Sequence, residues 1–104
     1  MIYVPTDNIA ASNTEAIANV TVPAKTPVIA GEEGICKGCG VATLSISYYD
    51  LGMTTGKMAA KILTGEADIS TMPIEFTTAT PKYNASMCET LGITPLEGYT
   101  AIAE

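Results

Sequence analysis

Two short apolar runs on either side of an amphipathic stretch constrain the fold of this chain more than any other feature. The runs are residues 2–4 and 28–30, and each is followed by polar and turn-forming residues. Between them, positions at steps of three and four form one mostly apolar stripe: Ile9, Asn13, Ala16, Ile17, Val20 and Ala24. This spacing predicts a helix, ending near Pro23, between two buried strands. Such a unit forms a parallel strand pair with a right-handed crossover, so the sequence predicts an α/β fold with an open, largely parallel sheet and flanking helices.

The rest of the chain continues the alternation of strands and helices. After a Gly-rich turn or short helix at residues 36–40, the pattern predicts a strand over 41–47, a helix over 51–63, a strand over 74–78 and a short helix over 84–91. Asp50 is placed to cap the long helix at its N-terminus, and Gly65 to end it. We expect residues 95–104 to form a loosely held tail.

Composition limits the function classes that this chain can serve. Its 104 residues suffice for one compact unit, and 47% of them are hydrophobic. Eleven acidic and five basic residues give a formal net charge of -6, which disfavours nucleic acid as a partner. The absence of histidine removes the Ser-His and Cys-His pairs of most hydrolases. The first residues form a β-type run, and we expect the chain to be a piece of a longer protein.

The pair Cys36 and Cys39 forms a CxxC motif, the spacing that lets two thiolates share one metal ion or form a redox pair. With Cys88 as the third cysteine and no histidine, one chain cannot supply the four ligands of a structural zinc site. The neighbouring Glu32 and Glu33 would raise a thiol pKa, not lower it. We therefore expect no metal and no cofactor, and a cysteine-based redox or metal-binding module is the alternative interpretation.

Polar side chains gather where the predicted strands end. They are Thr6, Asp7 and Asn8, then Glu32 and Glu33, then Tyr48 and Tyr49. Ligands bind in open α/β sheets beyond the carboxyl ends of the strands, so these side chains are the candidate ligand contacts. A carboxylate there suits a ligand ammonium, and a tyrosine offers an aromatic face with a polar tip. The competing interpretation is helix capping for Asp7 and solvated loop charges for Glu32 and Glu33.

Several segments in fixed order carry a family resemblance. They are IYVPTDN, PVIAGEEG, KGCGVATLSISYYDLGMTTGKMAAKILTGE, MPIEF and the closing N-x-x-x-C-x-x-LGI. Together they resemble the C-terminal third of the substrate-binding proteins of ABC importers of the tryptophan- and tyrosine-binding type. The resemblance covers residues 2 to about 94.

The resemblance implies a partial lobe of the type I periplasmic-binding-protein fold, which is Rossmann-like. In this family two lobes close on a small ligand, here an amino acid, and deliver it to a membrane permease without catalysis. The implied location is extracytoplasmic, either periplasmic or anchored by lipid. Residues 1–40 and 73–94 would be second-lobe elements, residues 41–66 first-lobe elements, and residues 95–104 a tail.

The resemblance also implies roles for the candidate contacts. Asp7 would bind the ligand ammonium, with Thr6 and Asn8 as its neighbours. Glu32 or Glu33 would be a loop contact, and Tyr48 or Tyr49 a contact near the hinge. We expect that this piece alone binds ligand incompletely, and that the apolar surface it exposes drives association with another copy.

Overall fold

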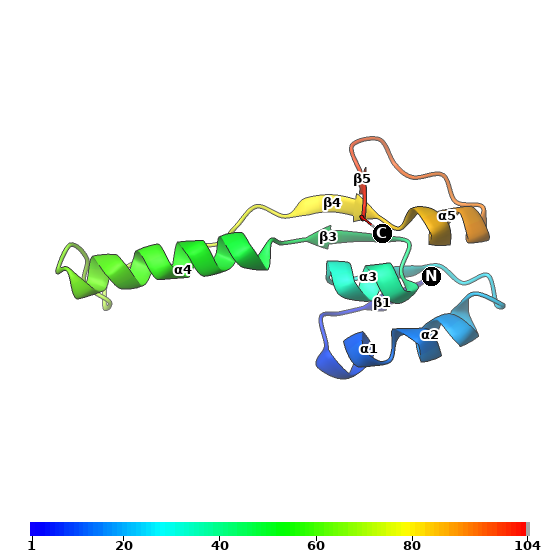
Figure 1. Ribbon diagram of the computed structural model, residues 1–104, viewed down its shortest axis with the longest axis horizontal. Coiled ribbons are helices and arrows are strands. Elements are labelled where there is room, and N and C mark those ends of the chain that lie inside the picture. Colours follow the sequence, from blue (N-terminus) through cyan, green and yellow to red (C-terminus); the bar gives the residue numbers. More distant parts are fainter. Residues whose placement is uncertain (104) are drawn as a thin grey trace. The chain divides into compact units, whose positions relative to one another are not determined.

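A computed structural model describes residues 1–103 (Figure 1). Backbone contacts divide the chain into two compact units. Unit 1 contains Met1–Ser45 together with the C-terminal part from Thr80 onward, and unit 2 contains Ile46–Ala79.

Unit 1 is built on a five-stranded sheet with the strand order β1-β2-β3-β4-β5. The strands are β1 (Ile2–Val4), β2 (Val28–Ala30), β3 (Ala42–Ser45), β4 (Thr80–Tyr83) and β5 (Thr100–Ala101). Strands β1, β2 and β3 run parallel, β4 runs antiparallel to β3, and β5 runs parallel to β4. The predicted α/β fold with an open, largely parallel sheet is therefore confirmed.

Two helices replace the single helix expected before Pro23. They are α1 (Asn8–Ser12) and α2 (Thr14–Thr21), and the break falls at Asn13. The Asn13 side chain donates a hydrogen bond of 2.8 Å to the carbonyl of Ile9. Its backbone N–H donates a hydrogen bond to the carbonyl of Ala10. An asparagine side chain competes in this way with the backbone hydrogen bonds of a helix. The spacing of apolar residues gives no sign of this competition.

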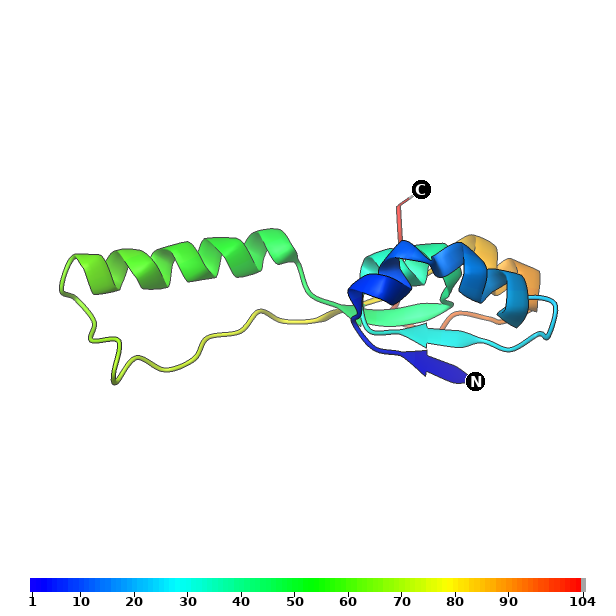
Figure 2. The same ribbon diagram turned by 90° about the horizontal axis from the view of Figure 1, so that it is seen from below.

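The core of unit 1 lies between the sheet and the helices on one of its faces. Helix α3 (Glu33–Cys39) forms where a turn or short helix was expected. Figure 2 shows α1, α2 and α3 over the same face of the sheet. The buried cluster there comprises Val28, Ala30, Ile35, Cys36 and Cys39, with Val4, Ala10, Ile17, Ala18 and Ile102 packed against it. The expected C-terminal helix is α5 (Ala85–Leu91), which ends at Gly92 with a φ of 68°.

Two expectations about the later strands are wrong. Residues 74–78 form no strand, and β4 begins instead at Thr80. Residues 95–103 are not a loose tail, because β5 pairs with β4 and Ile102 donates a 2.8 Å hydrogen bond to Tyr83, and residue 104 lies outside the described residues. Ile102 also packs against the core. Tertiary packing therefore orders the C-terminal segment that the sequence pattern assigned to a loose tail.

Unit 2 consists of the long helix α4 (Tyr48–Leu63) and an irregular segment that follows it. Ser47, not Asp50, is the N-cap residue, since its hydroxyl accepts a 3.1 Å hydrogen bond from the Asp50 backbone N–H. Gly65 follows the helix with a φ of 78°, as predicted. None of residues 46–79 is buried. No helix within residues 1–103 is long and apolar enough to cross a membrane.

Candidate functional site

The loops that follow β1 and β2 meet at the carboxyl edge of the sheet in unit 1. The Thr6 hydroxyl donates a 3.2 Å hydrogen bond to the carbonyl of Gly31, and the Gly31 N–H donates to Val4. A Cβ at Gly31 would lie 2.6 Å from the Thr6 nitrogen, so only glycine allows this approach. The structure thus brings together two of the three predicted groups of site residues.

Asp7 is the N-cap of α1. Its Oδ1 accepts a 2.8 Å hydrogen bond from the Ala10 N–H, and the side chain is exposed beside the equally exposed Thr6 and Asn8. Capping engages one carboxylate oxygen only. Oδ2 of Asp7 accepts no hydrogen bond from residues 1–103, so it keeps its acceptor sites.

Glu32 is the N-cap of α3, which corrects the interpretation of this residue as a solvated loop charge. One of its carboxylate oxygens accepts a 2.8 Å hydrogen bond from the Gly34 N–H, and the other accepts from the Ile35 N–H. Both oxygens of Glu32 are therefore engaged with the first turn of α3. Glutamate is not among the favoured cap residues, which explains why the sequence pattern did not indicate this role.

Glu33 forms an ion pair that the sequence did not predict. Lys82 on β4 donates a 2.6 Å hydrogen bond from Nζ to Oε2 of Glu33. Lys82 lies opposite Thr43 in the antiparallel β3–β4 register, so the two side chains share a sheet face. Thr43 is 1% exposed, and its hydroxyl has no hydrogen-bond partner within residues 1–103. The pair joins residues 49 apart in the sequence, so the local sequence pattern does not indicate it.

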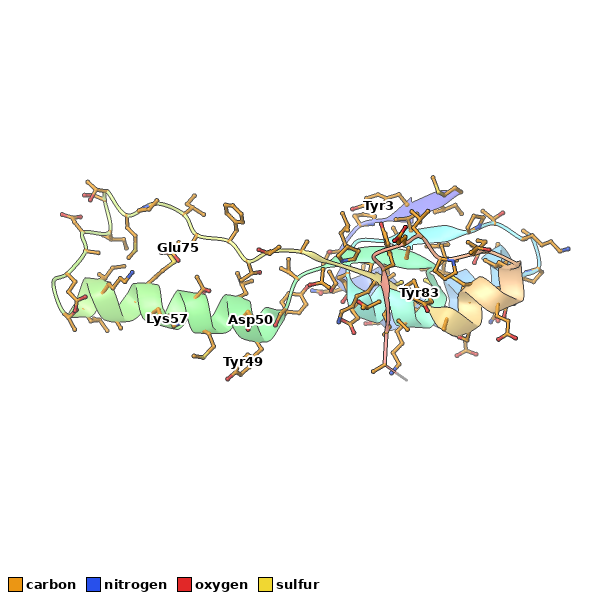
Figure 3. The ribbon with its side chains drawn as sticks, turned by 90° about the horizontal axis from the view of Figure 1, so that it is seen from above. Tyr3, Tyr49, Asp50, Lys57, Glu75 and Tyr83 are labelled. Atoms are coloured by element: carbon orange, nitrogen blue, oxygen red, sulfur yellow. The ribbon has the colours of Figure 1, made fainter. Side chains whose placement is uncertain are left out.

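Tyr48 and Tyr49 belong to the first turn of α4 in unit 2 and are 60% and 76% exposed. Figure 3 shows the Tyr49 side chain projecting away from the helix. Their convergence with the sheet edge of unit 1 stays a prediction.

The three cysteines are free, buried thiols. Burial, reinforced by the nearby Cys88 and Cys39 thiols and then by Glu33 and Glu32, raises the pKa of Cys36 to about 12. Burial also raises the pKa of Cys39 and of Cys88. A redox-active CxxC needs an accessible thiol with a lowered pKa, and this motif has the opposite properties. Within residues 1–103, no group of three Cys, Asp or Glu side chains is placed to hold a metal ion.

Comparison with known proteins places this geometry in a family. The family model described as ABC transporter substrate binding protein matches residues 1–104. A tyrosine-binding protein of Clostridioides difficile is 36% identical over 67 residues, which are 64% of this chain and 19% of that protein.

Solved structures give the same result. A substrate-binding protein with adhesive properties from Clostridium difficile, in its ligand-free, open form, matches 97% of this chain at 33% identity with a TM-score of 0.76. A Streptococcus pneumonia protein in complex with L-Trp matches 96% at 30% identity with a TM-score of 0.78. The chain spans only 35% and 36% of these two proteins. The family consists of solute-binding components, not enzymes, and the chain belongs to it: it is a member of the ABC transporter substrate-binding proteins.

Proposed function

We propose that the protein containing this chain captures an amino acid, preferably an aromatic one, between two lobes and delivers it to an ABC permease. The observation that carries the proposal is the uncommitted carboxylate oxygen of Asp7 at the carboxyl edge of the sheet. A tyrosine-binding relative and an L-Trp complex among the similar structures support the choice of an aromatic amino acid.

The three carboxylates of this edge differ in what they can offer a ligand. Glu32 uses both oxygens to cap α3, and Glu33 is paired with Lys82. Asp7 alone combines an exposed position with an oxygen that accepts nothing from residues 1–103. A ligand ammonium bound there would gain a charge-assisted hydrogen bond, with Thr6 and Asn8 as flanking contacts. Glu32 and Glu33 would then determine the conformation of the loop after β2. Tyr48 or Tyr49 would contact the ligand side chain.

The lobe assignment is part of the proposal. Ser45 and Thr80, where the chain leaves and re-enters unit 1, pair in register at the edge that carries the candidate site. Strand β3 belongs to the sheet of unit 1, so within residues 41–66 the first-lobe contribution would begin after Ser45. Residues 1–45 and the part of the chain from Thr80 onward would belong to the second lobe. The lack of any buried residue in unit 2 supports a further surface on which α4 packs.

Family membership supports an extracytoplasmic location, periplasmic or lipid-anchored, and a permease as the partner. The apolar side chains that the 104 residues expose support self-association of this chain by itself.

A ligand screen on the full-length protein tests the proposed function. Thermal unfolding is followed with each of the common L-amino acids, and a ligand that binds only the folded state raises the melting temperature. We expect L-tyrosine or L-tryptophan to give the largest increase. If no amino acid changes the melting temperature, the proposed substrate class is wrong.

A further inference from the structure

The ion pair between Lys82 and Glu33 ties the strand that re-enters unit 1 to the loop of the candidate site. Its Nζ–Oε2 distance is 2.6 Å, and the Lys82 and Glu33 side chains are 30% and 38% exposed. No other ion pair is recorded between side chains of residues 1–103. The pair is therefore a local feature of this edge, not part of a surface network.

Glu33 and Asp7 belong to two neighbouring segments that a hydrogen bond connects. Glu33 is two residues beyond Gly31, whose carbonyl accepts the Thr6 hydroxyl next to Asp7. Helices α1 and α3, which begin at these two loops, also contact each other. We therefore expect a change in the charge of Glu33 to alter the electrostatic potential where Asp7 would bind an ammonium.

We propose that Lys82 determines the charge specificity of the ligand site by compensating Glu33. With Lys82 present, Asp7 is the one carboxylate of the edge that neither a cation nor two helix N–H groups engage. That balance suits a zwitterion, which brings one ammonium and one carboxylate. This inference rests on the proposed function and adds the basis of its selectivity.

Removing the lysine charge would shift the preference of the site toward amines. An uncompensated Glu33 adds one negative charge near the ligand, which repels a ligand carboxylate and attracts an ammonium. L-Tyrosine and tyramine share the phenol and the ammonium and differ in the carboxylate. The ratio of their dissociation constants therefore measures the charge of the site with little influence from its shape.

The experiment compares this ratio in the full-length wild type with that in Lys82→Met, which keeps the aliphatic stem. The dissociation constants of L-tyrosine and tyramine are measured by calorimetry, with L-tryptophan and tryptamine as the second probe pair. We expect the ratio in Lys82→Met to shift toward the amine by about three- to tenfold, which corresponds to about 0.7 to 1.4 kcal/mol, the Coulomb energy of one well-solvated unit charge. The shift should shrink in concentrated salt, because exposed charges are screened.

Two further variants separate charge from structure. Lys82→Arg keeps the positive charge and should keep the wild-type ratio. Adding Glu33→Gln to Lys82→Met removes the unpaired carboxylate and should restore the ratio. A purely structural role would weaken both probes equally and would not respond to Glu33→Gln.

The outcomes are distinct. An unchanged ratio in Lys82→Met, with wild-type binding of L-tyrosine or L-tryptophan intact, overturns the role of Lys82 and leaves the proposed function standing. Failure of the wild type to bind any of the four probes overturns the proposed function and this inference with it.

Discussion

The two carboxylate oxygens of Asp7 have different surroundings. Oδ1 caps α1, and Oδ2 is directed to no partner within residues 1–103. Glu32 cannot do the same, because its two oxygens accept from two successive backbone N–H groups of α3. The two carboxylates thus differ in the number of backbone N–H groups that each one caps.

The roles of Asp7 can be separated by two substitutions in the full-length protein. Asp7→Asn keeps a side-chain oxygen for the cap but loses the charge, whereas Asp7→Ala loses both. We expect both variants to weaken amino-acid binding by about 1.5 to 3 kcal/mol, the worth of a charge-assisted hydrogen bond. Only Asp7→Ala should also lose about 1 kcal/mol of stability. Calorimetry and chemical denaturation measure the two quantities, and wild-type affinity in Asp7→Asn would assign Asp7 to capping alone.

Burial of Cys36 predicts a loss of stability at alkaline pH. The folded state raises the pKa of this thiol from 9.0 to about 12, so folding favours the protonated form. The resulting stabilisation is complete below pH 9.0 and is lost as the pH rises toward 12. The free energy of unfolding should therefore fall across this window, by at most about 1.4 kcal/mol per pH unit for one thiol.

Chemical denaturation under reducing conditions at several pH values measures this effect. The matched control is Cys36→Ala, in which the decline with pH should be smaller because only Cys39 and Cys88 remain as buried thiols with a raised pKa. An equal decline in both proteins would show that Cys36 does not titrate on unfolding.

At the scale of elements, the apolar pattern was sufficient for the alternation of strands and helices but not for their ends. The spacing around Ile9 and Ile17 predicted helix correctly and missed the break at Asn13, because that break depends on one side-chain hydrogen bond. The cap of α4 was assigned to Asp50 instead of Ser47, three residues earlier, where both residue types are good caps. Thr6 and Glu33 were predicted as site residues from the strand ends, and this stays a prediction, whereas no sequence pattern indicated Lys82 as the partner of Glu33.

The segment 74–78 has the sequence pattern of a strand but does not form one. Its alternation of Ile74, Glu75 and Phe76 is typical of a strand, yet it forms no ladder within residues 1–103. Ile74 and Phe76 are 93% and 87% exposed. A strand needs a neighbour to satisfy its backbone groups, and local propensity cannot supply one.

Two glycines test whether α4 packs on a further surface. A Cβ at Gly52 or at Gly56 meets nothing within 4 Å in this chain. In the 104-residue polypeptide, replacing both by alanine should therefore increase helix stability by about 1 kcal/mol per site. If the small-residue face packs closely against another lobe, the same variant should be destabilised in the full-length protein. Circular dichroism and thermal unfolding of both forms measure the two effects, and stabilisation in both would contradict the packing of this face.

At the scale of the whole chain, many large apolar side chains lie outside the buried core. The largest fully buried side chains include only Ile35 and Val28 among the large aliphatic ones, and both lie in unit 1. Tyr3 and Leu44 share the sheet face opposite that core and are 66% and 60% exposed. In unit 2, the large apolar side chains that are more than two thirds exposed are Tyr49, Leu63, Ile69, Ile74 and Phe76.

This surface leads to the prediction that the 104-residue polypeptide associates with itself. Exposed apolar surface favours association. Strand β1 also favours it, because within residues 1–103 it pairs with β2 alone and leaves an open strand edge. Sedimentation velocity across a dilution series, from about 100 to about 1 µM, should show a shift from an associated to a monomeric species. The matched variant replaces Ile74 and Phe76 by lysine, which adds charge to exposed positions and should move the equilibrium toward monomer. A monomeric species with cooperative unfolding at every concentration would show that these residues close their own core, and would contradict both self-association and the assignment of α4 to a first lobe.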